Sequence, residues 1–336
     1  MTIKDIAKEA GYAVGTVSRV LNNHPDVSET ARARIMEVVE RYNFHINSNA
    51  KHLKQQTNTA IAIIVKGARH MLFARLVETL QGLIKDTGYA CLVYYLDEDG
   101  NEVEQALRVC LERQPKGIIF LGSNYDYFRG QFEQVSIPCV MATSSARNLG
   151  YDNLSSICID DEEAARTVIR YLIGLGHQKI GILGGRLETD NVTLARYRGC
   201  QKAFAEQNYC FDAPKQYEVA RFAMDSGYRA MNRLLGKMPD VTAVFAMSDV
   251  MAIGAVRALK DHGLSVPEDV SVIGYDGIEM GEYMVPKLTT IKQPDEAIAR
   301  RSVEVLLLCI AGQPAVHEKI PFSLMTGESV RALEVK

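Results

Sequence analysis

The hydrophobic positions at the start of the chain repeat with the spacing of a short helix. Apolar residues fall at i, i+3, i+4 and i+7, as Ile3, Ile6, Ala7 and Ala10. Thr2 and Asp5 form a version of the capping box at the start of this helix, and Gly11 ends it. The pattern therefore predicts a helix over residues 3–10 that buries one face.

A second helix, from about Val14, has one apolar face and an outer face of small polar side chains. Its inner side holds Val17, Val20 and Leu21, and its outer side holds Gly15, Thr16, Ser18, Arg19 and Asn22. A helix that enters the major groove of DNA needs such an outer face. The pair predicts a helix-turn-helix, although these residues alone also suit an ordinary helical hairpin on a globular surface.

A third helix completes the N-terminal head. Ser28 can cap a helix whose shared apolar face consists of Ala31, Ile35, Val38, Val39 and Tyr42. Ser28, Thr30, Arg32 and Arg34 near its start can reach DNA phosphate oxygens, and a solvated polar face is the alternative for the two arginines. Residues 47–56 then hold too few apolar positions to form a stable helix in isolation.

From Thr59 onward, short apolar strands alternate with amphipathic helices. Strands are predicted over 60–65, 90–95, 117–121 and 138–142. The order then restarts, with strands near 156–159, 179–183, 216–220, 242–246 and 270–274, and it ends with a strand at 288–291, a helix over about 295–311 and two short strands. The predicted fold class is α/β, with a three-helix head and a body of two doubly wound parallel-sheet lobes.

Composition and charge indicate a globular, non-membrane protein with a basic N-terminal end. The 336 residues are 47% hydrophobic and 24% charged, as in a globular protein of two or three domains. No apolar run approaches the roughly 20 residues that cross a bilayer, and no signal-peptide segment starts the chain, so a cytoplasmic location is expected. Residues 1–56 carry a net charge of +2 and the remainder −5, which fits a protein that touches DNA at one end.

The seven cysteines predict neither a disulfide framework nor a metal site. They are Cys91, Cys110, Cys139, Cys158, Cys200, Cys210 and Cys309, without metal-ligand spacing. Most lie in apolar stretches, so buried reduced thiols are expected. The Gly-rich loop at 181–186 has neither dinucleotide-binding nor P-loop spacing, and no other catalytic motif is present, so neither an enzyme nor a cofactor is expected.

The motif T-I-K-D-I-A-K-E-A-G, followed by T-V-S-R-V-L-N, resembles the opening of the lactose-repressor/galactose-repressor family of bacterial transcription regulators. V-S-V-I-G-Y-D-G (270–277) and Y-M-V-P-K-L-T-T-I-K-Q (283–293) extend the resemblance over essentially the whole chain. The resemblance implies an allosteric repressor with a periplasmic-binding-protein-like body that the chain crosses three times. The implied divisions are a head (1–46), a hinge helix (47–57), an N-terminal lobe (58–157 and 289–318) and a C-terminal lobe (158–288 and 319–336).

The resemblance also implies the DNA-binding residues: Thr2, Val14, Gly15, Thr16, Ser18, Arg19, Asn22, Ser28, Thr30, Arg32, Asn47, Ala50, Lys51 and Leu53. In the family hinge pattern P-N-x-x-A-R-x-L, which stands here as I-N-S-N-A-K-H-L, the leucine wedges into the minor groove. Ile46 and Lys51 depart from that pattern, and Lys51 lacks the planar fork of an arginine. Ala13 replaces the usual serine cap, a loss of about 1 kcal/mol, and Gly15 offers no side chain to a base, so an unusual operator is expected.

Ligands of doubly wound sheets bind outside the carboxyl ends of the strands, so the cleft between the lobes is the expected effector site. Its loops supply Arg69, His70, Phe73, Ser123, Asn124, Thr143, Arg196, Phe222, Ser248, Asp249 and Asp276. A carboxylate, a guanidinium and an aromatic face suit a sugar. Thr143, Ser248 and Gly277 depart from the residues of many sugar-binding members, and Arg69 and His70 make the cleft more basic. A phosphorylated or acidic metabolite, or a purine, therefore stays open as the effector.

A sugar-binding protein without DNA function would share the predicted body, but it would lack the head. Two such small heads are needed to read a palindromic operator with useful specificity, so a homodimer is expected. No heptad tail of the kind that joins dimers into tetramers follows the last strand, and the sequence leaves higher oligomers open.

Overall fold

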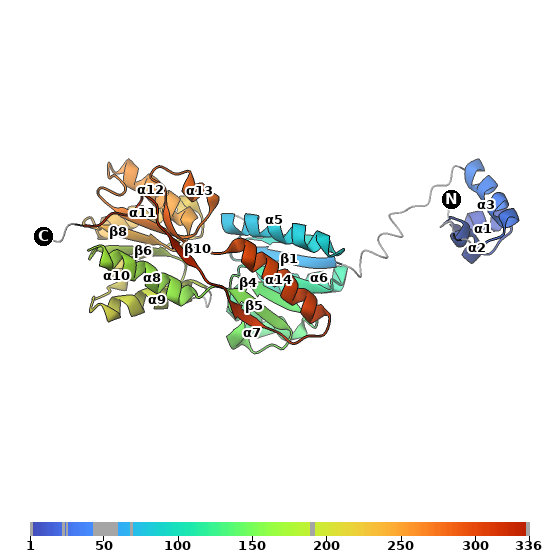
Figure 1. The fold of residues 1–336 in the computed structure, drawn as a ribbon, viewed down its shortest axis with the longest axis horizontal. Coiled ribbons are helices and arrows are strands. Elements are labelled where there is room, and N and C mark those ends of the chain that lie inside the picture. The colour runs from blue at the N-terminus through green and yellow to red at the C-terminus, as the bar shows by residue number, and fades with distance from the viewer. Residues whose placement is uncertain are drawn as a thin grey trace. The chain divides into compact units, whose positions relative to one another are not determined.

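The structure is a computed structural model, and it describes residues 3–21, 24, 26–42, 60–67, 70–188 and 192–333. It contains two compact units, residues 1–56 and 57–336, which are described separately. Figure 1 shows the elements of both units.

The head consists of three helices around a small apolar core. They are α1 (Ile3–Ala10), α2 (Val14–Leu21) and α3 (Glu29–Arg41). The core side chains come from all three helices and are Ile6, Ala7, Ala10, Val17, Val20, Ile35, Val38 and Val39. Gly11 has a φ of 76°, a left-handed conformation that ends α1. Ser28 Oγ accepts a hydrogen bond from the Ala31 N–H (3.4 Å) and caps α3 as predicted.

The N-terminal lobe is built on a fully parallel six-stranded sheet with the order β11-β5-β4-β3-β1-β2. Its strands are β1 (Ala60–Lys66), β2 (Ala90–Leu96), β3 (Gly117–Leu121), β4 (Cys139–Ala142), β5 (Leu154–Cys158) and β11 (His317–Lys319). Its helices are α5 (Met71–Asp86), α6 (Glu102–Arg113), α7 (Tyr125–Gln131) and α14 (Asp295–Ile310), with short 3-10 turns at Phe132–Gln134 and Arg147–Leu149. Alternate residues of β1 enter different core clusters: Ile63 packs with the α5 and α14 side, and Ile64 with the α6 and α7 side. Both faces of this sheet are therefore covered, as the unbroken apolar run predicts.

The C-terminal lobe has a similar six-stranded sheet with the order β12-β10-β9-β8-β6-β7. It is parallel except at its edge, where β12 runs antiparallel to β10, a departure from the predicted parallel sheet. Its strands are β6 (Ile180–Gly184), β7 (Tyr217–Val219), β8 (Ala243–Ala246), β9 (Ser271–Asp276), β10 (Thr289–Lys292) and β12 (Ser323–Met325). Its helices are α8 (Asp161–Gly174), α9 (Val192–Glu206), α10 (Ala213–Gln216), α11 (Met224–Lys237), α12 (Asp249–Asp261) and α13 (Glu279–Glu282). The one-turn helices α10 and α13 are too short to leave a hydrophobic period, and the sequence did not predict them.

The chain passes between the lobes three times, after β5, after β10 and after β11, as the family resemblance implies (Figure 1). Two predicted boundaries are off by one residue, because Cys158 and Lys319 pair with each other in the N-terminal sheet. A third differs more, because the prediction assigned residues 289–318 to the N-terminal lobe. Thr290 pairs with Gly274 of β9, so β10 belongs to the C-terminal sheet. The chain leaves that sheet only at Gln293 and Pro294, because the parallel ladder with β9 continues through Lys292.

No helix in the described ranges is long and apolar enough to span a membrane. All seven cysteines are free thiols, but only Cys139, Cys158 and Cys200 are buried. The expectation that most of them are buried is therefore wrong: Cys91, Cys110 and Cys309 are half-buried, and Cys210, in the loop between α9 and α10, is exposed.

Candidate functional site

The outer face of α2 is open, as a DNA-reading helix requires. Val17 and Val20 point into the head core, while Val14 is 42% exposed and Gly15 and Arg19 are exposed. Thr16 and Ser18 are half-buried on the same helix. Six predicted DNA-binding residues lie outside the described residues: Thr2, Asn22, Asn47, Ala50, Lys51 and Leu53.

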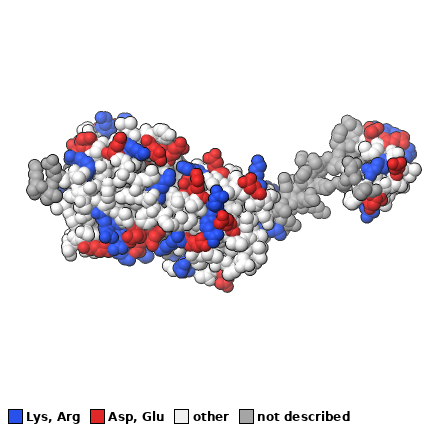
Figure 2. Space-filling view, viewed as in Figure 1, with Lys and Arg blue, Asp and Glu red and all other residues white. Residues whose placement is uncertain are grey.

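The start of α3 combines structural and exposed groups. The Ser28 hydroxyl caps the helix. Thr30 is exposed beside it, with 3.3 Å between the two hydroxyl oxygens. Arg32 Nη2 donates a hydrogen bond of 2.6 Å to the His24 carbonyl, so this arginine also holds the turn between α2 and α3. Lys and Arg are interspersed with Asp and Glu on the visible faces of both units (Figure 2). The visible face of the head therefore shows no continuous basic patch among its described residues.

A cavity of about 880 Å³ lies between the two lobes of the body. Its lining comes from loops that follow strands of both sheets, where doubly wound sheets bind ligands. Of the predicted effector residues, His70, Phe73, Ser123, Asn124, Thr143, Arg196 and Phe222 line it. Arg69 lies outside the described residues. Asp276 lies just behind this wall, in contact with His70.

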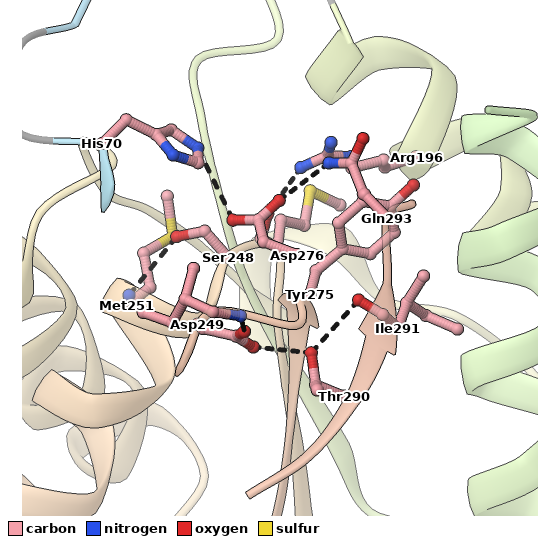
Figure 3. A network of polar contacts seen from close by, with 12 residues as sticks. His70, Arg196, Ser248, Asp249, Met251, Tyr275, Asp276, Thr290, Ile291 and Gln293 are labelled. Atoms are coloured by element: carbon pink, nitrogen blue, oxygen red, sulfur yellow. Dashed lines mark hydrogen bonds and ion pairs between the residues drawn. The ribbon is translucent and has the colours of Figure 1, made fainter. Parts of the chain in front are cut away.

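His70 connects the two lobes inside the cavity. Its ring stacks on Phe73 of its own lobe at a centroid distance of 4.5 Å and on Phe222 of the other lobe at 5.4 Å. Its Nε2 lies 3.6 Å from Asp276 Oδ2 (Figure 3). Burial, and then the charge of Arg196, lowers the pKa of His70 to about 3. The imidazole is therefore neutral at physiological pH, which corrects the expectation that His70 makes the cleft more basic.

Asp276, the last residue of β9, is 1% exposed and adopts a positive φ of 117°. Gln293 Nε2 donates a hydrogen bond of 2.9 Å to its Oδ1. Burial raises the pKa of Asp276 well above its usual value, Arg196 opposes this shift, and the neighbouring carboxylate of Asp249 adds to it. Thr143, at the end of β4, also has a positive φ, of 72°. Two non-glycine residues in a strained backbone conformation thus border the same cavity, a feature of functional sites.

Arg196 is fixed by three groups of its own lobe. Its Nε donates to Asp161 Oδ1 at 2.8 Å and its Nη1 donates to the Met247 carbonyl at 2.6 Å. Its guanidinium carbon lies 3.7 Å from the centroid of the Tyr275 ring. The Tyr275 hydroxyl in turn donates to Asp161 at 2.8 Å. A planar donor held in this way needs no rearrangement to bind a ligand.

Ser248 and Asp249 have structural roles behind the cavity wall. Both are fully buried, and Ser248 Oγ accepts a hydrogen bond from the Met251 N–H to cap α12 (3.3 Å). The Asp249 carboxylate accepts the Thr290 hydroxyl (2.6 Å) and the Ile278 N–H (2.8 Å), and burial raises its pKa to about 7 (Figure 3). Both residues were predicted to bind the effector because they follow a strand in the sequence. In the structure their side chains point into the lobe instead of into the cavity.

Sequence reasoning missed several wall residues. Lys66 Nζ lies 2.8 Å from Glu102 Oε2, almost fully buried, and 4.5 Å over the Tyr127 ring. Ser144 and Gln293 also line the cavity. The sequence could have indicated Lys66, because a lysine at the end of a buried apolar strand needs a polar partner for its ammonium group.

Five buried polar atoms at or just behind this wall have no hydrogen-bond partner within the described part of the chain. They are His70 Nδ1, Ser123 Oγ, Ser144 Oγ, Gln293 Oε1 and Asp276 Oδ2. A buried polar atom without a partner costs about 1–3 kcal/mol, so native proteins rarely leave one unpaired without a reason. Their clustering beside one cavity makes this wall the candidate site for a hydrogen-bonding ligand.

Five cations of the wall, in contrast, have carboxylate partners. The pairs are Lys66–Glu102, Arg196–Asp161, Arg221 with Asp97, Glu98 and Asp99, Arg229–Asp225 and Arg233–Glu218. An anionic ligand would have to compete with these carboxylates. The cavity-wall atoms that lack a hydrogen-bond partner thus belong mainly to neutral groups.

The head and the two-lobed body together define a helix-turn-helix transcriptional regulator with a ligand-binding core. Residues 2–47 match the profile of bacterial regulatory proteins of the lacI family, and residues 169–330 match a periplasmic binding protein-like domain. The HTH-type transcriptional regulator MalR of Clostridium butyricum is 34% identical over 315 residues, which cover 92% of this chain and 93% of MalR. The chain belongs to the lacI family.

Two further relatives carry repressor names. The HTH-type transcriptional repressor PurR of Haemophilus influenzae is 33% identical over 313 residues, 91% of this chain and 90% of PurR. The probable HTH-type transcriptional repressor ExuR of Bacillus subtilis is 33% identical over 341 residues, 99% of both chains. These relatives are transcriptional regulators and not enzymes.

Solved structures share the whole architecture. The complex of the transcriptional regulator CelR with cellobiose superposes with a TM-score of 0.72 at 27% identity, covering 98% of this chain and 99% of that one. The Lac repressor dimer bound to operator and the anti-inducer ONPF superposes with a TM-score of 0.74 at 26% identity, covering 99% of both chains.

Proposed function

We propose that this protein is a cytoplasmic homodimeric repressor that binds a palindromic operator, and that a neutral sugar in the interlobe cavity controls its operator affinity. The observation that supports a sugar as the effector is the cluster of five polar atoms without hydrogen-bond partners at the cavity. Cellobiose in CelR and operator DNA on the Lac repressor dimer support the two ligand classes, because both structures share this fold.

Hydroxyl groups satisfy the open positions of the cavity. A sugar hydroxyl both donates and accepts, so it can pair with the serine hydroxyls, the neutral imidazole and the carbonyl oxygen of Gln293. The cavity of about 880 Å³ lies within the usual range of small-molecule sites and has room for a mono- or disaccharide. Arg196, already aligned by Asp161, contributes a fixed donor to the same ligand.

The charge pattern favours a neutral effector over an acidic or phosphorylated one. His70 is neutral, and Lys66 and Arg196 each pair with a buried carboxylate. A purine is also disfavoured, because the ring of His70 already stacks on both Phe73 and Phe222 and occupies one face of each.

Control of DNA binding follows from contacts that join the lobes. A ligand that bridges His70 of one lobe and Arg196 of the other binds the closed cleft more tightly than the open cleft. It therefore shifts the population of lobe orientations. The hinge and head are attached to the start of the N-terminal lobe, so this shift changes how the two heads of a dimer are presented to the operator.

Calorimetric titration tests the effector class. Neutral sugars, including cellobiose, are compared with matched uronic acids and sugar phosphates on the full chain. We expect at least one neutral sugar to bind, and its charged analogue to bind at least tenfold more weakly. Equal or tighter binding of the charged analogues would overturn the assignment.

Two serine variants provide the matched comparison. Ser144→Ala removes an unpartnered hydroxyl on the cavity wall and is expected to weaken sugar binding about five- to tenfold, the value of one hydrogen bond. Ser302→Ala removes an unpartnered hydroxyl buried in α14, away from the cavity lining, and is expected to leave sugar affinity unchanged.

A further inference from the structure

One arginine ties the two lobes together at the edge of the cavity. Arg221 follows β7 of the C-terminal lobe, and it reaches an acidic turn, Asp97–Asp99, that follows β2 of the N-terminal lobe. Its Nη2 lies 2.9 Å from Asp97 Oδ1 and 2.5 Å from Asp99 Oδ2, and its Nε lies 3.3 Å from Glu98 Oε2. A single guanidinium thus contacts three successive carboxylates across the cleft.

The acidic turn is held by hydrogen bonds within its own lobe. The Gly100 N–H donates to the Asp97 carbonyl at 2.9 Å, and the Asp99 N–H donates to the Asp97 carboxylate at 3.3 Å. Asn101 then caps α6 by accepting the N–H groups of Val103 (3.0 Å) and Glu104 (3.2 Å). Little conformational entropy remains to be lost when the turn meets its partner.

The arginine side is equally fixed. The Arg221 N–H donates to Ser226 Oγ at 2.9 Å, and the Ala223 N–H donates back to the Arg221 carbonyl at 2.7 Å. The Phe222 N–H donates to the Glu98 carboxylate, and the Phe222 ring stacks on His70. The ion-pair cluster is therefore continuous with the aromatic contact inside the cavity.

The electrostatics of this contact favour the closed cleft. Three adjacent carboxylates repel one another, and the guanidinium of Arg221 from the opposite lobe offsets part of that repulsion when the cleft is closed. The backbone N–H of Asp99, together with the charge of Arg221, lowers the pKa of Asp97, so this carboxylate is ionised at neutral pH. Arg221 and Asp97 remain 48% and 75% exposed, so salt screens their attraction.

We propose that Arg221 and the turn Asp97–Asp99 form a rim latch that closes the cleft without an effector and slows the passage of the effector in and out. The regulatory meaning of the latch rests on the proposed function, but closure itself does not. The latch makes the effector-free protein partly closed at low salt, and high salt opens it.

Hydrogen exchange of the effector-free full chain tests the latch directly. Arg221→Ala is expected to speed amide exchange in residues 97–101 and 217–223 about fivefold at low salt, a change typical of a lost exposed ion pair. At about 1 M salt, where screening acts within about 3 Å, wild type should approach the variant. Arg129→Ala is the matched control, because its side chain is 50% exposed and pairs with Asp126 inside one lobe.

Charge reversal separates the latch from a general loss of structure. Arg221→Glu should match or exceed the effect of Arg221→Ala, and adding Asp97→Arg and Asp99→Arg to Arg221→Glu should restore slow exchange. The latch is refuted if Arg221→Ala and Arg129→Ala exchange alike, or if the reversed cluster fails to recover protection. These results need no effector, so they stay distinct from a failure of the sugar titrations.

Discussion

Arg196 and Asp161 form an ion pair of 2.8 Å at the cavity, with 3% and 8% of their side chains exposed. Such a pair stabilises the protein only while both partners are present. Removing the guanidinium leaves the Asp161 carboxylate buried with the Tyr275 hydroxyl. The same guanidinium therefore serves the stability of the C-terminal lobe as well as the proposed ligand site.

Arg196→Met should lower the free energy of unfolding by about 3–5 kcal/mol and abolish effector binding. Urea unfolding of the full chain measures the first effect and calorimetry the second. The double variant Arg196→Met with Asp161→Asn removes the uncompensated charge, so it should recover much of the stability but not the binding. Recovery of binding in the double variant would show that Arg196 acts only through stability.

His70 gives a pH-dependent contribution with a defined sign. Its pKa is about 3 in the fold and about 6.5 in an unfolded chain, so below pH 6.5 the unfolded state takes up a proton that the folded state does not. The stability that neutral His70 contributes is complete above pH 6.5 and is lost as the pH falls toward 3.

Relative to His70→Asn, wild type should lose about 2 kcal/mol of unfolding free energy between pH 7 and pH 5, at about 1.4 kcal/mol for each pH unit below 6.5. Denaturant unfolding of both proteins across this range measures the difference. The other titrating groups around the ring, Asp276, Asp249 and Arg196, are present in both proteins. Parallel pH profiles would contradict a neutral His70.

Thr143 holds a left-handed backbone (φ 72°) that β-branched residues rarely adopt. Thr143→Asn places a residue that tolerates this conformation better, and it should raise the unfolding free energy by about 1 kcal/mol. Thr79→Asn, in the regular helix α5, should change it by less than about 0.5 kcal/mol. Equal effects in thermal unfolding at both positions would argue against strain at Thr143.

Arg19 lies on the outer face of α2, the helix proposed to read DNA; its side chain is 62% exposed and lies 3.7 Å from Asp26. Arg19→Ala should weaken operator binding about 10- to 100-fold, the usual value of one good base contact. Arg41→Ala, at the end of α3 and paired with Glu37 (2.7 Å), should have little effect. Fluorescence anisotropy with labelled operator compares them, and equal losses would place DNA recognition elsewhere.

Most of the fold followed from local patterns. The predicted helix over 3–10 and strand over 117–121 match α1 and β3 residue for residue, because hydrophobic periods and helix-ending glycines are encoded locally. The assignment of β10 to a lobe was wrong, because strand pairing with β9 depends on residues that a linear reading does not connect.

The site was predicted less completely, for the same physical reason. His70, Arg196 and Phe222 were predicted correctly as wall residues because they lie in loops that follow strands. The position after a strand does not reveal which way a side chain points, and Ser248 and Asp249 point into the lobe. The neutral state of His70 arises from burial by Phe73 and Phe222, which come from different lobes. The contact of Arg221 with Asp97 joins residues more than a hundred positions apart and left no local signal.

The most direct test of the central claim is operator binding measured with and without sugar. The full chain would first select its preferred sites from a random double-stranded DNA library, and anisotropy would then follow binding during titration with neutral sugars and their charged analogues. We expect the protein to select a palindromic site that one dimer binds. A neutral sugar should change the affinity for this operator at least tenfold, and its uronate or phosphate should not. Selection of no palindrome, or a response only to the charged analogues, would contradict the central claim.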